Sequence, residues 1–208
     1  MPVPKVPKVQ RPEKPLKAED ACPETLQCCN RAYSYLPNLT KSLDNIKAKD
    51  VIDQARINEI VLWKINRYAE MSPEALAALD AVKTLRRGQH NHQKAKDAFT
   101  ALLLTKGINV AMASSILRMR NPKVFQIFDG HAYRTVMGEK MPELPKPASK
   151  SDEDIKKNIE EKFELYTEYM DTISPLATSK GLKFKDLDRA LYVYDKKVNR
   201  PLNPKEDE

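Results

Sequence analysis

Two apolar helical stripes separated by a short turn constrain the fold of this chain more than any other feature. The first stripe has the i, i+3, i+4, i+7, i+8 spacing of one helix face and consists of Ala95, Ala98, Phe99, Leu102 and Leu103. The turn is Gly107-Ile108-Asn109, in which both outer residues tolerate positive φ and the central one is apolar. The second stripe consists of Val110, Ala113 and Leu117. The sequence therefore predicts two helices joined by a tight hairpin.

The predicted hairpin has the properties of an anion site. The first backbone N–H groups of a helix have no acceptor within the helix and lie at the positive end of its dipole, an arrangement that binds phosphate. We expect the hairpin to contact phosphates through Lys106, Gly107, Ile108, Asn109, Val110 and Ala111. The structural alternative is an ordinary helical hairpin, which is common in helical proteins.

An aspartate follows the second stripe at the start of another predicted helix. The apolar run 125–128 is typical of a buried extended segment, and Asp129 directly after it stands at an N-cap position. Gly138 is expected to end the helix that Asp129 begins. Asp129 is therefore expected to be held rigidly by its capping role.

Composition narrows the class of protein. The chain has 208 residues, only five glycines and a net charge of +7, which indicates a mainly helical protein suited to a polyanionic partner. Many basic proteins, however, simply carry solvated lysines. The three cysteines, Cys22, Cys28 and Cys29, have no matching histidine cluster, so we expect reduced thiols and no metal site. Without an apolar run of membrane-spanning length or a signal-peptide core, we expect a cytoplasmic protein that does not contact membranes.

The order of helix, hairpin, helix, extended run and aspartate resembles the helix-hairpin-helix DNA glycosylase superfamily, the group of endonuclease III and the 8-oxoguanine glycosylases. The resemblance covers residues 100–140 in detail and 50–138 more loosely, with these matching segments: 102–104, 107–109, 113–117 and 129–134. It implies an all-α, two-lobed helical bundle. It also implies a monomer that removes a damaged or mispaired base from double-stranded DNA, with Asp129 as the catalytic carboxylate.

Two positions depart from the family pattern. Asn109 replaces the second hairpin glycine, although asparagine also tolerates the left-handed conformation. Ala111 stands where bifunctional members carry a Schiff-base lysine, so the resemblance implies a monofunctional glycosylase without lyase activity. No cysteine follows Cys29, which excludes the iron–sulfur cluster of some relatives. The only cofactor that the resemblance allows is a monovalent cation at the hairpin.

Three further residues are candidates for supporting roles. By resemblance, Arg134 supports the fold around Asp129, and His131 lies one turn inside the same helix, within reach of substrate or solvent. Lys64 is a candidate to supply an amine in place of the family lysine that is missing at position 111. Two alternatives to the enzyme remain: a non-catalytic helix-hairpin-helix DNA-binding protein, and a helical scaffold that contacts another protein.

The chain is expected to contain five segments. Residues 1–21 form a tail rich in proline and lysine, and residues 22–49 form a helical segment of the second lobe. Residues 50–140 form the hairpin lobe, residues 141–150 a proline-rich connector, and residues 151–208 the remainder of the second lobe. By resemblance, the two segments of the second lobe pack together across a cleft from the hairpin lobe.

Outside the hairpin, cap residues predict the helix positions. Asp50 is expected to cap a helix that reaches about residue 69 and directs Ile57, Ile60, Val61 and Tyr68 toward a core. Further helices are expected from Glu24 to Leu36, from Ser72-Pro73 to Gly88, from Ser151 to about Met170, and from Phe184 to Val198.

Overall fold

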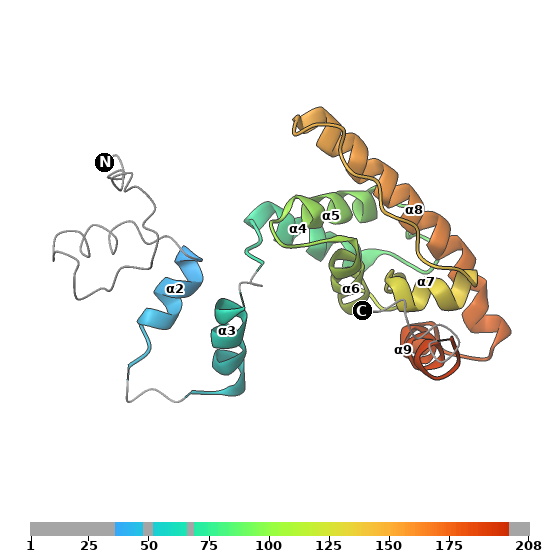
Figure 1. The fold of residues 1–208 in the computed structure, drawn as a ribbon, viewed down its shortest axis with the longest axis horizontal. Helices are drawn as coiled ribbons and strands as arrows, with labels where there is room; N and C mark the ends of the chain where they lie inside the picture. The colour runs from blue at the N-terminus through green and yellow to red at the C-terminus, as the bar shows by residue number, and fades with distance from the viewer. Residues whose placement is uncertain (1–35, 48–51, 66–68, 200–208) are drawn as a thin grey trace, which may run out of the picture. The chain divides into compact units, whose positions relative to one another are not determined.

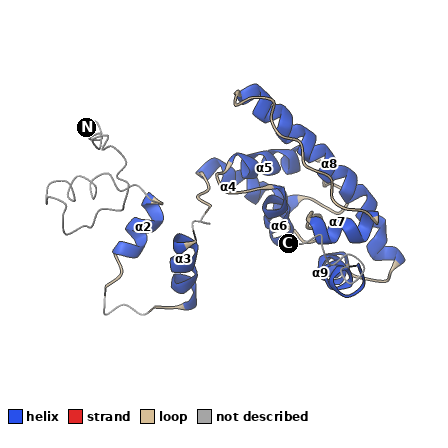
Figure 2. Cartoon of the chain, in the orientation of Figure 1, coloured by secondary structure: helices blue, strands red, loops and turns tan. Residues whose placement is uncertain are grey.

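The computed structural model describes residues 36–47, 52–65 and 69–199. In these ranges the chain is all-α: helices are joined by loops and turns, and no strand is present (Figure 2). The chain divides into two compact units, Met1–Tyr68 and Ala69–Glu208. The all-α fold class predicted from the sequence is confirmed. The expected helix from Glu24 to Leu36 and the tail 1–21 fall outside the described ranges, apart from Leu36.

The N-terminal unit contributes two described helices, α2 (Pro37–Asp44) and α3 (Gln54–Lys64). Proline at the first helical position suits the start of α2, because its missing N–H would have had no acceptor there. The side chain of Asp53 caps α3 by accepting the Arg56 backbone N–H at 2.8 Å. The prediction that this helix begins after Asp50 is therefore wrong by one helical turn.

The apolar stripe of α3 is exposed. The side chains expected in a core are 43% exposed for Ile57, 38% for Ile60 and 50% for Val61. No residue of α3 is buried, and Leu39 is the buried hydrophobic side chain among the described residues of this unit. The expectation that these three side chains face a core is wrong, because spacing shows which side chains share a face and not what covers that face. Tyr68, the fourth residue expected there, lies outside the described residues.

The C-terminal unit contains six α-helices and three short helical turns within the described residues. In chain order these are α4 (Pro73–Ala81), η2 (Val82–Thr84), α5 (Gln93–Leu104), α6 (Val110–Arg120), α7 (Gly130–Met137), α8 (Asp152–Ser179), η3 (Phe184–Asp186), α9 (Leu187–Tyr194) and η4 (Asp195–Asn199). Figure 1 shows α8 as the longest helix of this unit, running past α5 and α7. The expected last helix, from Phe184 to Val198, is thus built from three pieces.

Side-chain caps at the predicted positions begin three of these helices. Ser72 caps α4, Asp129 caps α7, and Ser151 caps α8. Gly138 ends α7 in the left-handed conformation, as predicted. The helix that begins after Ser72 ends at Ala81 and continues only as the turn η2, well before the expected end at Gly88.

Helix α8 is longer than its sequence suggested. It continues past the expected end at Met170 to Ser179 and contains Pro175. The extension is explained by burial, because Ile173 and Ala177 continue the helical spacing of the buried Met170 and are themselves fully buried.

A single core joins the hairpin segment to the C-terminal helices. Buried apolar side chains between Val82 and Ala132 belong to the same cluster as those between Ile159 and Leu191. Phe99 of α5 stacks on Tyr166 of α8 with ring centroids 5.4 Å apart. Segments that the sequence assigned to two lobes therefore share one core.

The described residues contain neither a membrane-spanning helix nor a cluster of metal-binding side chains. None of the described helices is long and apolar enough to cross a membrane. Within the same residues, no group of three or more His, Cys, Asp and Glu side chains is placed to hold a metal ion.

Candidate functional site

The hairpin between α5 and α6 turns on a single left-handed residue. Gly107 has φ +88°, and Ile108 behind it is buried. Asn109 is extended, with φ −99° and ψ 179°, and its Oδ1 accepts the Met112 backbone N–H at 2.9 Å. Asn109 therefore does not adopt the left-handed conformation that asparagine tolerates. It caps α6, and a capping residue has an extended backbone.

The start of α6 offers unpaired backbone donors. The Asn109 side chain accepts a hydrogen bond from the Met112 backbone N–H, and the Asn109 carbonyl oxygen accepts one from the Ala113 backbone N–H. The N–H groups of Val110 and Ala111 have no acceptor in the part of the chain that the structure describes. Lys106 is exposed beside them. The first turn of α6 is thus able to bind an anion.

A hollow of about 390 Å³ adjoins the hairpin and brings cationic and amide groups to it. Its walls include Asn109, Lys146 of the connector and Lys162 of α8. The Lys162 Nζ donates to Asn158 Oδ1 at 2.6 Å, whereas the buried Asn158 Nδ2 has no hydrogen-bond partner among the described residues. Partial burial lowers the pKa of Lys162. Lysine and amide donors therefore lie on one side of the hairpin, in the wall of this hollow.

Two tyrosines of α8 hold the extended run that leads to Asp129. Tyr166 Oη donates to the Gln126 carbonyl at 3.0 Å, and Tyr169 Oη donates to the Ile127 carbonyl at 3.1 Å. Burial raises the pKa of both hydroxyls, so they stay protonated and remain donors. These bonds fix the backbone immediately before Asp129.

Ser114 links the same run to α6. Its Oγ accepts the Phe128 N–H at 3.0 Å and donates to the Ala111 carbonyl at 2.9 Å. The first turn of α6 and the residue before Asp129 are therefore joined through one buried hydroxyl.

Asp129 is partly buried on the wall of a second hollow, of about 470 Å³. Its Oδ1 accepts the Ala132 N–H at 2.8 Å, and its Oδ2 has no hydrogen-bond partner among the described residues. The hollow lies between the start of α7 and one face of α9, which contributes Asp188, Arg189 and Tyr192. Oδ1 is thus held in place by the helix cap, whereas Oδ2 is free to accept a hydrogen bond.

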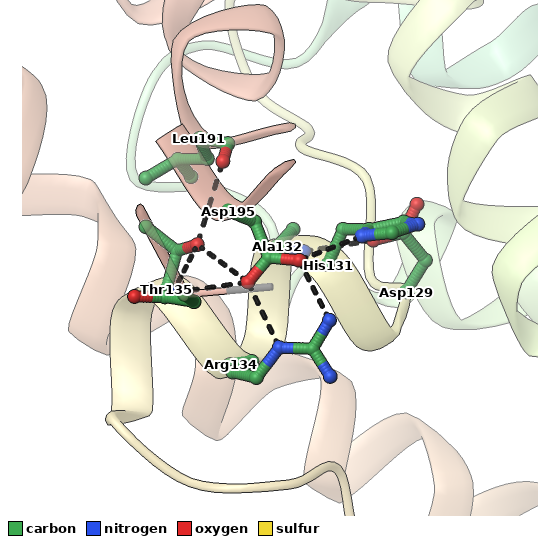
Figure 3. Close-up of polar contacts among 8 residues, drawn as sticks. Asp129, His131, Ala132, Arg134, Thr135, Leu191 and Asp195 are labelled. Carbon is green, nitrogen blue, oxygen red and sulfur yellow. Dashed lines mark hydrogen bonds and ion pairs between the residues drawn. The ribbon is translucent and has the colours of Figure 1, made fainter. Parts of the chain in front are cut away.

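Asp195 joins α7 to the end of α9 (Figure 3). Arg134 donates to both of its oxygens, from Nε to Oδ1 at 2.9 Å and from Nη2 to Oδ2 at 2.7 Å. His131 Nδ1 lies 2.7 Å from Oδ2, and Asn199 Nδ2 donates to Oδ1 at 2.9 Å. Asp195 is fully buried, and the bonds from Arg134 hold its pKa well below the usual range despite that burial.

The structure places the candidate supporting residues as follows. Arg134 and His131 both contact Asp195, and the ring of His131 also lies edge-on to Tyr192 at 5.0 Å. Both therefore brace the α7–α9 contact that forms the hollow beside Asp129. Lys64 is the exposed last residue of α3, in the N-terminal unit.

The sequence did not single out several residues that position the site. Asp195 is 61 residues from Arg134, and Tyr166 is 40 residues from Gln126. Contacts over such separations leave no local pattern. The signal that was available is the aromatic spacing of Tyr166 and Tyr169 on one face of α8.

Comparisons with known proteins identify no relative. No family model matches the chain, and neither the curated proteins nor the solved structures contain a significant match.

Proposed function

We propose that this protein is a monofunctional DNA glycosylase that hydrolyses the N-glycosidic bond of a damaged or mispaired base in double-stranded DNA. The observation that carries the proposal is the state of Asp129. One carboxylate oxygen is fixed by the helix cap, and the other is uncommitted on the wall of a hollow of about 470 Å³.

Asp129 has the chemistry that this reaction requires. As the base leaves, C1′ of the sugar develops positive charge, and a nearby carboxylate stabilises that charge and orients the attacking water. Water adds its oxygen to C1′, and the base departs with a proton. A rigid carboxylate contributes more than a mobile one, because it needs no reorganisation during the reaction.

The surroundings of Asp129 suit an extruded base. Tyr192 supplies an aromatic ring and Arg189 a cationic group on the opposite wall of the hollow. Enzymes that act on a base in a duplex turn it out of the stack and hold it against such side chains. The unpaired amides at the start of α6 would hold a backbone phosphate while the base is extruded.

Ala111 supports hydrolysis over lyase chemistry. It lies in the first turn of α6, and its methyl group cannot form a Schiff base with the sugar. The proposal therefore includes base release without cleavage of the DNA strand.

The experiment is base release from a panel of duplexes that carry different lesions and mismatches. We expect the native protein to leave an abasic site in at least one of them, with the strand uncut until alkali is added. Asp129→Asn should lower the rate by about 100-fold or more, the usual loss when one electrostatic contact to a transition state is removed. DNA binding without base release from any duplex would instead favour a non-catalytic DNA-binding protein.

A further inference from the structure

A hollow of about 520 Å³ lies at the opposite end of α6 from the hairpin. Three segments form it: the loop after η2, the turn that follows α6, and the start of η3. Ten described residues line it, and none of these ten is acidic. Six of them are cationic: Lys83, Arg86, Arg87, Lys123, Lys183 and Lys185. Its lining thus carries a high density of positive charge.

Most of this charge is not neutralised within the protein. Lys83 pairs with Asp80 at 2.5 Å. Arg86, Lys123, Lys183 and Lys185 are exposed and form no ion pair within the described residues. Like charges held this close repel one another, so the arrangement is stabilised when an anion binds.

The wall of the hollow is rigid. The Arg87 guanidinium lies 5.1 Å from the centre of the Phe184 ring and donates to the Ser174 carbonyl at 2.9 Å. Buried Asn121 donates to the Val82 and Leu85 carbonyls at 2.9 and 3.1 Å, which ties the turn after α6 to η2. The segments that carry the lysines are therefore fixed relative to one another.

We infer that this hollow is a binding surface for the phosphate backbone of nucleic acid, separate from the hairpin. The four unpaired cations come from three segments around an open hollow, a distribution suited to a chain of phosphates. A protein partner is disfavoured, because protein interfaces have apolar centres and none of the described residues that line this hollow is a large exposed hydrophobic side chain.

The position of the hollow adds to the inference. Helix α6 has 11 residues, so at 1.5 Å per residue the hairpin and the hollow are separated by roughly 15 Å along it. Two phosphate contacts at the two ends of one helix would fix its direction on the nucleic acid. The inference rests on the charges of the hollow and does not depend on catalysis by Asp129.

The test compares two triple variants of the full chain that remove the same charge. The hollow variant is Lys123→Ala/Lys183→Ala/Lys185→Ala. The control variant is Lys140→Ala/Lys150→Ala/Lys156→Ala, which changes exposed lysines outside the hollow. Circular dichroism melting should show that both fold like the native protein, because all six side chains are exposed.

Binding to fluorescein-labelled undamaged duplex DNA is measured by anisotropy over a series of NaCl concentrations. Each phosphate contact contributes about 0.9 to the slope of log K against log salt, so the hollow variant should lose about 2 to 3 of that slope. Its affinity should also fall about tenfold or more at low salt. The control variant should keep the native slope.

Four outcomes would overturn the inference. Equal losses in both variants would mean that net charge alone attracts DNA. An unchanged slope in the hollow variant, or no DNA binding by the native protein, would exclude the surface. Loss of inorganic phosphate or polyglutamate binding in the hollow variant, with DNA binding intact, would assign the hollow to a small anion or an acidic polypeptide.

Discussion

Two aspartates at the α7–α9 junction have opposite environments. Asp195 is fully buried, and Arg134, His131, Asn199 and Thr135 lie within hydrogen-bonding distance of its carboxylate. Asp129 is partly buried, and within the described residues its carboxylate accepts a hydrogen bond only from the Ala132 N–H of its own helix. A buried carboxylate whose oxygens are both hydrogen-bonded is suited to holding helices together, whereas a carboxylate with a free oxygen can also contact a substrate directly. Asp195 therefore has a structural role, whereas Asp129 is the carboxylate to which we assign the proposed chemistry.

The largest stability effect is expected at Asp195. Asp195→Asn removes the charge that pairs with Arg134, which is itself largely buried, and such losses cost about 3 kcal/mol. Urea unfolding measures the change. Glu160→Gln is the control, because its ion pair with Lys96 is exposed and its loss should barely change the unfolding midpoint. Similar unfolding curves for the two variants would contradict the structural role of Asp195.

The same assignment predicts the direction of a pH effect. The pKa of Asp195 is lower in the folded protein than in the unfolded chain, so its stabilising contribution is complete above the ordinary carboxyl pKa. That contribution is lost as the pH falls below this value toward the folded pKa. Native protein should therefore lose more stability than Asp195→Asn between pH 5 and pH 3, a range set by the usual aspartate pKa of about 3.9.

An intermediate effect is expected at the hairpin. Gly107→Val forces a β-branched residue into a left-handed conformation with φ +88°, which costs about 1 to 2 kcal/mol. Gly138→Val imposes similar strain at φ +75° outside the hairpin. Both variants should unfold more easily, but only Gly107→Val should weaken DNA binding, and equally for all sequences. Equal DNA affinity in the two variants would exclude the hairpin as a phosphate contact.

The smallest stability effect is expected at Asp129. Asparagine caps a helix about as well as aspartate, so Asp129→Asn should change stability by less than about 1 kcal/mol. Asp53→Asn is the matched control, because Asp53 caps α3 through the same kind of bond at 2.8 Å. A large loss of stability at Asp129 alone would show that its carboxylate also holds structure.

The sequence predicted the local features of the C-terminal unit and missed the contacts between distant segments. The caps at Ser72, Asp129 and Ser151 and the end of α7 at Gly138 follow from residue types at neighbouring positions. The contacts of Asp195 depend on which helix faces which, and this information is not local.

One tolerance predicted from the sequence is not used in the structure, and one prediction is wrong; both outcomes have physical causes. Asn109 was expected to tolerate a left-handed turn, yet Gly107 alone provides that turn and Asn109 caps α6. The stripe of α3 has the spacing of a buried face, yet Ile57, Ile60 and Val61 are exposed. For Asn109, the residue type is compatible with both the left-handed and the extended conformation. For the stripe of α3, the spacing does not show whether another segment covers the apolar face.

The most direct test of the central claim separates binding from chemistry at Asp129. Single-turnover base release and duplex affinity are measured for the native protein, Asp129→Asn and Asp53→Asn. We expect Asp129→Asn to bind DNA as tightly as the native protein or more tightly, because it removes a negative charge near phosphates. We expect its rate of base release to fall by about 100-fold or more. Asp53→Asn should match the native protein in both measurements. Native rates of base release in Asp129→Asn would contradict the assignment of chemistry to this carboxylate.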